Sequence, residues 1–139
     1  MIEQPDTQDY DELLRIWELA VRSTHHFLTE NDILFYKPLV RDEYFQAVEL
    51  YMLRGSTGRI AAFLGLSEDN IEMLFVHPDE QGRGYGKCLI DFAVHEKRIY
   101  KVDVNEQNEK AFHFYQNRGF EVVGRNGKAF PDYAYAIIG

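Results

Sequence analysis

The spacing of apolar residues predicts two helices in the first third of the chain. After a capping residue at Asp6 or Thr7, apolar side chains recur with the 3.6-residue period of an amphipathic helix. These positions are Leu13, Leu14, Ile16, Trp17, Ala20 and Val21. Thr29, which is followed by acidic residues, is typical of a second helix start. That helix should run toward Tyr44, with a bend or a break at Pro38.

Strand-like segments dominate the rest of the chain. They are expected at residues 47–54, 59–66, 71–77, 99–104, 120–125 and 133–138, with a short edge strand at residues 1–4. Helices are expected at residues 84–97 and 108–118, and Gly119 should end the second one. Because this order mixes antiparallel hairpins with a strand–helix–strand unit, it predicts a single α+β (mixed α/β) domain that spans residues 1–139.

Charge and composition narrow the classes of function. The 139 residues carry a formal net charge of −8, which argues against general binding of nucleic acid or anionic membranes. An acidic protein suits a cationic substrate such as an amine. Cys88 is the single cysteine, so no intrachain disulfide can form. The sequence shows neither a signal peptide nor an apolar run of the roughly 20 residues that span a bilayer, so we expect a cytoplasmic protein.

A glycine-rich turn between a predicted strand and a predicted helix is the most informative motif. The backbone N–H groups of such a turn, with a helix N-terminus behind them, suit a bound anion such as a pyrophosphate. The P-loop pattern fails, because Gln81 stands at its first glycine and Cys88 at its metal-binding hydroxyl. The dinucleotide pattern GxGxxG fails because Lys87 replaces its last glycine. The pattern that fits is Gln/Arg-x-x-Gly-x-Gly/Ala, filled by Gln81, Gly84 and Gly86.

A second motif lies about one helix and one strand later. From Asn108 through Tyr115 to Phe120, the chain fills every position of the pattern N-x-x-A-x-x-F-Y-x-x-x-G-F. Asn108 also suits a helix N-cap. Together the two motifs resemble the signature blocks of the Gcn5-related N-acetyltransferases (the GNAT family). Three segments further resemble a subgroup of small bacterial acetyltransferases of the YjaB type: residues 21–28, 105–109 and 127–131.

This resemblance implies a fold and a cofactor site. The implied fold is a twisted, mostly antiparallel sheet of about six or seven strands, flanked by about four helices, in which two parallel central strands splay apart. Acetyl-CoA is the implied cosubstrate, and backbone amides of the glycine turn grip its pyrophosphate. The implied cofactor contacts are Leu74, Phe75, Val76, Gln81, Gly82, Arg83, Gly84, Tyr85, Gly86, Lys87, Asn108 and Tyr115.

The resemblance also implies catalytic roles. The backbone N–H of Val76 would stabilise the oxyanion of a tetrahedral intermediate. The Tyr115 hydroxyl would protonate the departing thiolate, since a phenol with a reference pKa of about 10 keeps its proton at neutral pH. A base must also take a proton from the attacking amine. Asp103 and Glu72 occupy strand positions where relatives carry a base, although either carboxylate also suits a solvated strand face.

Other reactive side chains give weaker signals. The histidines and Cys88 lack the spacing of metal ligands, so no metal is expected. His25 or His26 would border the acceptor site in the family, and either also suits an exposed helix end. Cys88 suits a small packed residue better than a covalent nucleophile.

The leading hypothesis is an acetyl-CoA-dependent N-acetyltransferase that moves an acetyl group to a primary amine by direct attack. The alternative is a non-catalytic module that senses coenzyme A or acyl-CoA. The acceptor stays open between a small-molecule amine and a peptide, and neither nucleic acid nor membrane is an expected partner. A homodimer also stays open, with the strand at residues 133–138 as a candidate contact.

Overall fold

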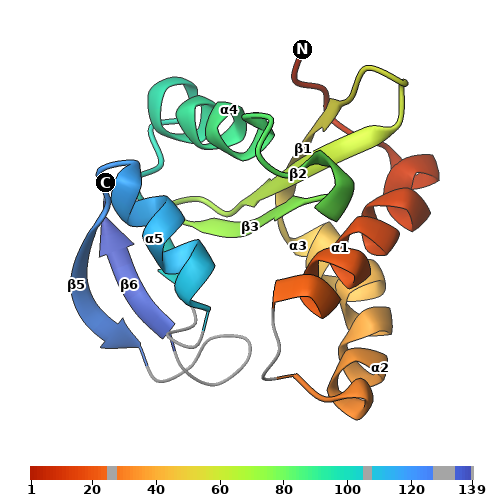
Figure 1. The fold of residues 1–139 in the computed structure, drawn as a ribbon, viewed down its shortest axis with the longest axis horizontal. Coiled ribbons are helices and arrows are strands. Elements are labelled where there is room, and N and C mark those ends of the chain that lie inside the picture. The colour runs from red at the N-terminus through yellow and green to blue at the C-terminus, as the bar shows by residue number, and fades with distance from the viewer. Residues whose placement is uncertain (25–27, 105–107, 127–133, 139) are drawn as a thin grey trace.

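The fold is a central sheet with helices on both faces. The computed structural model describes residues 1–24, 28–104, 108–126 and 134–138 (Figure 1). Within these residues the sheet has six strands in the order β1-β2-β3-β4-β6-β5. The strands are β1 (Glu49–Arg54), β2 (Ile60–Leu66), β3 (Ile71–Val76), β4 (Lys101–Val104), β5 (Glu121–Asn126) and β6 (Ala134–Ile138). The predicted mixed α+β class is confirmed.

The sheet opens between β3 and β4. The other neighbouring pairs in the described sheet are antiparallel, whereas β3 and β4 are parallel. β2 and β3 pair along their length, up to Ala62 opposite Val76. In contrast, β3 and β4 pair only where Ile71 lies beside Val102 in the described residues. The two strands diverge beyond that point, in agreement with the splay that the resemblance implied.

Helices cover the two faces of the sheet, and each face has its own core. The α-helices are α1 (Tyr10–Thr24), α2 (Glu30–Leu39), α3 (Phe45–Ala47), α4 (Tyr85–Asp91) and α5 (Glu109–Asn117). On one face, Trp17 of α1 joins a core that contains Met52 of β1. On the opposite face, Leu89 of α4 and Tyr115 of α5 join a core that contains Tyr51 of β1. Adjacent residues of β1 enter opposite cores because side chains alternate along a strand.

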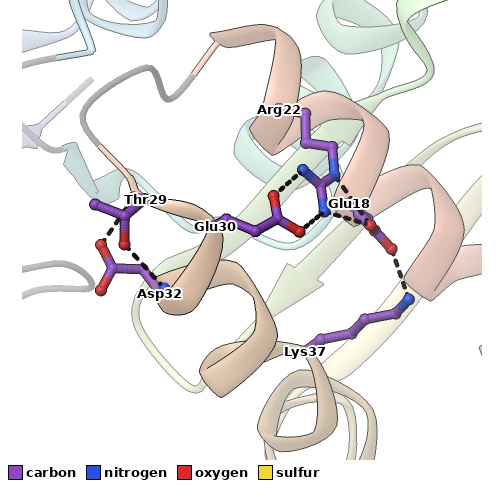
Figure 2. Close-up of polar contacts among 6 residues, drawn as sticks. All are labelled: Glu18, Arg22, Thr29, Glu30, Asp32 and Lys37. Atoms are coloured by element: carbon purple, nitrogen blue, oxygen red, sulfur yellow. Dashed lines mark hydrogen bonds and ion pairs between the residues drawn. The ribbon is translucent and has the colours of Figure 1, made fainter.

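The two predicted helix starts have side-chain caps. The Asp6 carboxylate accepts from the Gln8 N–H at the start of a short 3₁₀ turn, Thr7–Asp9, which leads directly into α1. At the start of α2, the Thr29 hydroxyl accepts from the Asp32 N–H at 3.1 Å, and the Asp32 carboxylate accepts from the Thr29 N–H at 2.9 Å (Figure 2). Each such cap is worth about 1 kcal/mol to its helix.

One prediction in the N-terminal half is wrong: residues 1–4 do not form an edge strand, because Glu3 makes only an isolated bridge to Met52. Pro38, where a bend or a break was expected, lies inside α2, which ends one residue later at Leu39. Proline cannot donate the N–H that the helix needs at that position, and the chain widens soon afterwards into a π-helical turn, Val40–Tyr44, before α3.

The segment between the glycine turn and β4 also differs from the prediction. The helix expected at residues 84–97 is α4 followed by a π-helical turn, Phe92–Glu96. The strand expected from residue 99 begins at Lys101 instead. The reason is local: Arg98 adopts a positive φ of 59°, and the Ile99 N–H still donates to the Ala93 carbonyl at 2.9 Å.

Candidate functional site

A cavity of about 280 Å³ lies between β3, the glycine turn, α4 and α5. Most of the residues predicted to contact the cofactor line this cavity, which we call the main pocket. They are Leu74, Phe75, Val76, Gln81, Gly82, Gly84, Tyr85, Gly86, Lys87, Asn108 and Tyr115. Arg83 is absent from its described lining, and its guanidinium lies 3.6 Å from the Glu80 carboxylate. In this structure the Arg83 side chain therefore pairs with Glu80 and does not line the main pocket.

The conformation of the glycine turn lets its backbone approach the main pocket closely. Gly82 and Gly84 have positive φ values of 81° and 87°, a conformation that other residues rarely adopt. The first helical hydrogen bond of α4 runs from the Cys88 N–H to the Gly84 carbonyl at 3.0 Å. The N–H groups just before Cys88 have no partner within the helix. They suit an anion that approaches the start of α4.

Gly86 allows α4 to begin close to its neighbours. A Cβ at this position would lie 3.5 Å from the Phe114 ring of α5 and 3.6 Å from the Val76 side chain of β3. These are ordinary contact distances, so an alanine would fit and a larger side chain would not. Gly86 therefore fixes how closely the turn sits against β3 and α5.

Two backbone amides of β3 point toward the side from which β4 has diverged. The His77 N–H donates to the Ala61 carbonyl of β2 at 2.8 Å. Because N–H directions alternate along a strand, the Phe75 N–H also faces β2, and those of Leu74 and Val76 face the opposite side. Both Leu74 and Val76 line the main pocket. The strand thus offers a ladder of N–H groups to an extended molecule in that pocket.

Asn108 and Tyr115 bring α5 to the same pocket. The Asn108 side chain caps α5 by accepting from the Ala111 N–H at 3.2 Å. Tyr115 is 6% exposed, and its ring packs against those of Phe114 and Phe120. This burial raises the pKa of Tyr115 above its ordinary value. Its hydroxyl consequently keeps its proton at neutral pH and can donate it.

A second cavity, of about 110 Å³, lies in the splay between β3 and β4. Glu72 and Asp103, the two candidate bases, both line it, and Tyr115 lines both cavities. Glu72 is the extra residue of a bulge on β3, inserted where the pairing to β2 shifts register. The Asp103 Oδ1 atom is buried and has no hydrogen-bond partner among the described residues. The structure therefore brings the two carboxylates to one cavity beside the phenol.

Sequence reasoning missed several residues of the main pocket. Ala20 of α1, Glu80 and Lys110 line it, and none of them was predicted to do so. Lys110 occupies a variable position of the second motif, and Ala20 carries no chemical signal. Ala111 and Phe114, which fill two apolar positions of the second motif, also line the pocket. The histidines expected near the acceptor, His25 and His26, lie outside the described residues.

An ion-pair network joins α1 to α2 (Figure 2). The Arg22 guanidinium donates to both oxygens of Glu30, at 2.6 and 2.8 Å, and to Glu18 at 3.0 Å. Lys37 of α2 lies 2.7 Å from Glu18. Lys37 and Arg22 lower the pKa of Glu18, Arg22 lowers the pKa of Glu30, and these carboxylates raise the pKa of Arg22. The network spans residues 18–37 and so ties together the two helices on either side of residues 25–27.

Comparison with known proteins identifies the family. The profile of the acetyltransferase (GNAT) domain matches residues 43–122. The chain is also 32% identical over 137 residues to the peptidyl-lysine N-acetyltransferase YjaB of Escherichia coli (strain K12), an alignment that covers 95% of this chain and 92% of YjaB. The chain belongs to the GNAT acetyltransferase family. Its activity is the transfer of an acetyl group to an amine, and the comparisons give no support to the sensor alternative.

Solved structures extend this similarity to the GNAT fold. The solution structure of apo YjaB from Escherichia coli has a TM-score of 0.83 at 30% identity and covers 99% of this chain and 93% of its own. The PaiA N-acetyltransferase of Thermoplasma acidophilum, in complex with coenzyme A, has a TM-score of 0.77 at 15% identity, with 98% and 96% covered. The second likeness shows the fold alone.

Within the residues that the structure describes, two further features are absent. None of the helices there has the length and apolarity required to cross a bilayer. In the same residues, no three side chains among His, Cys, Asp and Glu gather as a metal-binding group.

Proposed function

We propose that this protein transfers the acetyl group of acetyl-CoA to the side-chain amine of a lysine in a peptide or protein. The observation that carries the proposal is the pocket itself, in which glycine-turn amides, the Leu74 and Val76 amides and Tyr115 converge. The lysine acceptor is supported by the name of the YjaB relative, a peptidyl-lysine N-acetyltransferase. The net charge of −8 suits a cationic acceptor.

The residues of the main pocket fit acetyl-CoA by their chemistry. Gly82 and Gly84 free the turn for close backbone approach to the pyrophosphate. Lys87 and Lys110, which line the pocket, add positive charge for the phosphates. The outward N–H of Leu74 suits an amide carbonyl of the pantetheine arm, which would take the place of a neighbouring strand.

The protein's part in the chemistry is to stabilise charge and to move protons. Acetyl-CoA supplies an activated acyl group as a thioester. The Val76 N–H donates a hydrogen bond to the carbonyl oxygen, where negative charge grows as the amine attacks. Tyr115 donates its proton to the sulfur that leaves, and burial of the phenol keeps that proton in place until then.

The acceptor amine binds in the second cavity. An alkyl ammonium is charged at neutral pH and must lose a proton before it can attack. Glu72 and Asp103 line this cavity and can attract the ammonium, and either can take the proton directly or through a water. Asp103, with a buried oxygen that lacks a partner among the described residues, is the first candidate for the base.

Two measurements on the purified protein test the proposal. Titration calorimetry with acetyl-CoA should give saturable binding with one site per chain. Release of free coenzyme A should then depend on a lysine peptide with blocked termini, and the same peptide with norleucine in place of lysine should be inert. Binding of acetyl-CoA without transfer to any lysine peptide would refute the acceptor, and transfer to small amines alone would replace it. Absence of binding would refute the whole proposal.

A further inference from the structure

Asn70, directly before β3, is a buried polar residue for which the proposed chemistry gives no role. It is 6% exposed, and its side-chain nitrogen donates to Glu72 Oε1 at 2.9 Å and to the Ile71 carbonyl at 3.4 Å. A carboxylate can only accept hydrogen bonds, so the nitrogen of the amide must face Glu72 and the oxygen must face away. That oxygen has no hydrogen-bond partner among the described residues.

The position of Asn70 is fixed from both sides. Its own carbonyl accepts from the Ser67 N–H at 2.9 Å and from the Ser67 hydroxyl at 3.3 Å, which closes the turn before β3. The next residue, Ile71, makes the described pairing between β3 and β4. Asn70 therefore sits at the vertex of the splay, and its amide is a rigid donor rather than a mobile one.

Within the described residues, no side chain other than Asn70 donates a hydrogen bond to the Glu72 carboxylate. Glu72 is an exposed residue on a bulge, and a glutamate side chain there has several rotamers available. The hydrogen bond from Asn70 selects one arrangement of this carboxylate, in the wall of the cavity that Asp103 also lines. We propose that Asn70 is a positioning residue that holds Glu72 beside the second cavity, so that the acceptor ammonium meets both carboxylates at once. This proposal rests on the proposed function.

A purely structural role for Asn70 accounts poorly for its chemistry. A buried amide oxygen without a partner destabilises the fold relative to an apolar side chain of similar volume. The turn bonds use only the backbone carbonyl of Asn70, which any residue offers. A leucine would therefore preserve the turn bonds while removing the contact to Glu72 and the longer bond to the Ile71 carbonyl, and the two roles predict opposite effects on stability.

The test compares Asn70→Leu in two backgrounds. In the wild type, the substitution should lower kcat/KM for the blocked lysine peptide by about tenfold, the usual effect of a lost hydrogen bond to a charged group. In a Glu72→Ala background it should change kcat/KM less than about twofold, because the carboxylate it acts through is gone. The melting temperature should not fall, and the Kd for acetyl-CoA should stay within about twofold. Equal losses in both backgrounds, a lower melting temperature or weaker acetyl-CoA binding would each overturn the proposal.

Two further variants and one spectrum complete the test. Ser67→Ala removes a bond in the same turn without touching Glu72, and its kcat/KM should match the wild type. Asn70→Asp keeps the size of the side chain but removes the donor, and it should reproduce the loss seen with leucine. The carboxyl ¹³C resonance of Glu72 should shift in Asn70→Leu toward that of glutamates that accept no hydrogen bond from a side chain. This resonance reports on the contact without turnover, so an unshifted signal overturns the positioning role even if no lysine peptide proves to be a substrate.

Discussion

The site has two walls, one that binds the cofactor and one that binds the acceptor, and they differ in whether backbone or side-chain groups form them. The cofactor wall consists largely of backbone: the turn with Gly82 and Gly84, and the N–H groups of Leu74 and Val76. The acceptor wall consists of side chains, with Glu72 and Asp103 in the second cavity. Backbone donors depend on main-chain conformation, whereas side-chain groups depend on packing and charge. The cofactor wall should therefore fail through changes in conformation, and the acceptor wall through changes in charge.

The largest expected effect comes from the phenol between the two walls. Tyr115→Phe removes the proton donor and should lower kcat by about 100-fold, the lower range for general acid catalysis. Acetyl-CoA affinity should be nearly unchanged, since the ring stays in place. Stopped-assay kinetics and calorimetry check this, with the exposed Tyr100→Phe as control. A Tyr115→Phe enzyme with wild-type turnover would remove Tyr115 from the mechanism.

The next largest effect is expected at Gly84, and it distinguishes a change in the conformation of the turn from a general loss of fold stability. Gly84→Ala forces an alanine into φ near 87°, at a cost of about 1–2 kcal/mol, and should weaken acetyl-CoA binding by about tenfold as the turn relaxes. Gly58, in the hairpin turn before β2, has φ of 86° and equally open surroundings. Gly58→Ala should therefore destabilise the fold similarly and leave acetyl-CoA binding intact. Equal Kd values for the two variants would contradict a backbone-built cofactor wall.

Burial of Tyr115 also predicts a pH effect on stability. The pKa of Tyr115 is raised in the folded state, so above the unfolded pKa of about 10 only the unfolded chain releases this proton. Stability is therefore fully retained below that pH and falls as the pH rises, with a slope of up to about 1.4 kcal/mol per pH unit. Urea unfolding between about pH 9 and pH 11 should show that the free energy of unfolding falls less with rising pH in Tyr115→Phe than in the wild type. An identical alkaline loss in both proteins would show that the phenol is accessible to solvent.

The smallest effect tests the charged side of the comparison. Glu30→Gln removes the negative charge and one of the two oxygens that accept from Arg22, and it should raise the KM for the lysine peptide slightly without changing acetyl-CoA affinity. Because exposed ion pairs are screened, the difference should disappear in high salt. The pKa of Glu30 is lowered, so its contribution is present above the ordinary carboxyl range and is lost as the pH falls below it. Glu43→Gln, at an exposed acid for which the described residues record no ion pair, is the control. A change in acetyl-CoA affinity would contradict the separation of the walls.

The same contrast explains what the sequence could predict. The glycine turn, Asn108 and Tyr115 were predictable because backbone-built sites need particular residues at fixed spacing. The caps at Asp6 and Thr29 were predictable for a similar reason. These features are local, so a single sequence contains them.

Features that depend on distant partners or single-residue insertions were not predictable. The bulge at Glu72 shifts the strand period by one residue, which leaves no trace in an alternating pattern. The π-helical turns after α2 and α4 each insert an extra residue into a helical turn, and no residue type marks that insertion in the sequence. The bond from Lys37 to Glu18 joins residues of separate helices. Glu72 and Asp103 were themselves predicted as candidate bases, but the bulge that places Glu72 in the acceptor wall was not.

The divergence of β3 and β4 makes the sheet, in its described part, two three-stranded units that share a single pairing point at Ile71 and Val102. A ligand that accepts hydrogen bonds from the Leu74 and Val76 amides would connect the two units where they diverge. A ligand that binds only the folded state stabilises it by mass action. The concentration of acetyl-CoA would therefore affect the stability of the folded chain as well as its rate of turnover. A chain starved of acetyl-CoA would keep an unfinished strand edge, the kind of surface at which extended chains associate.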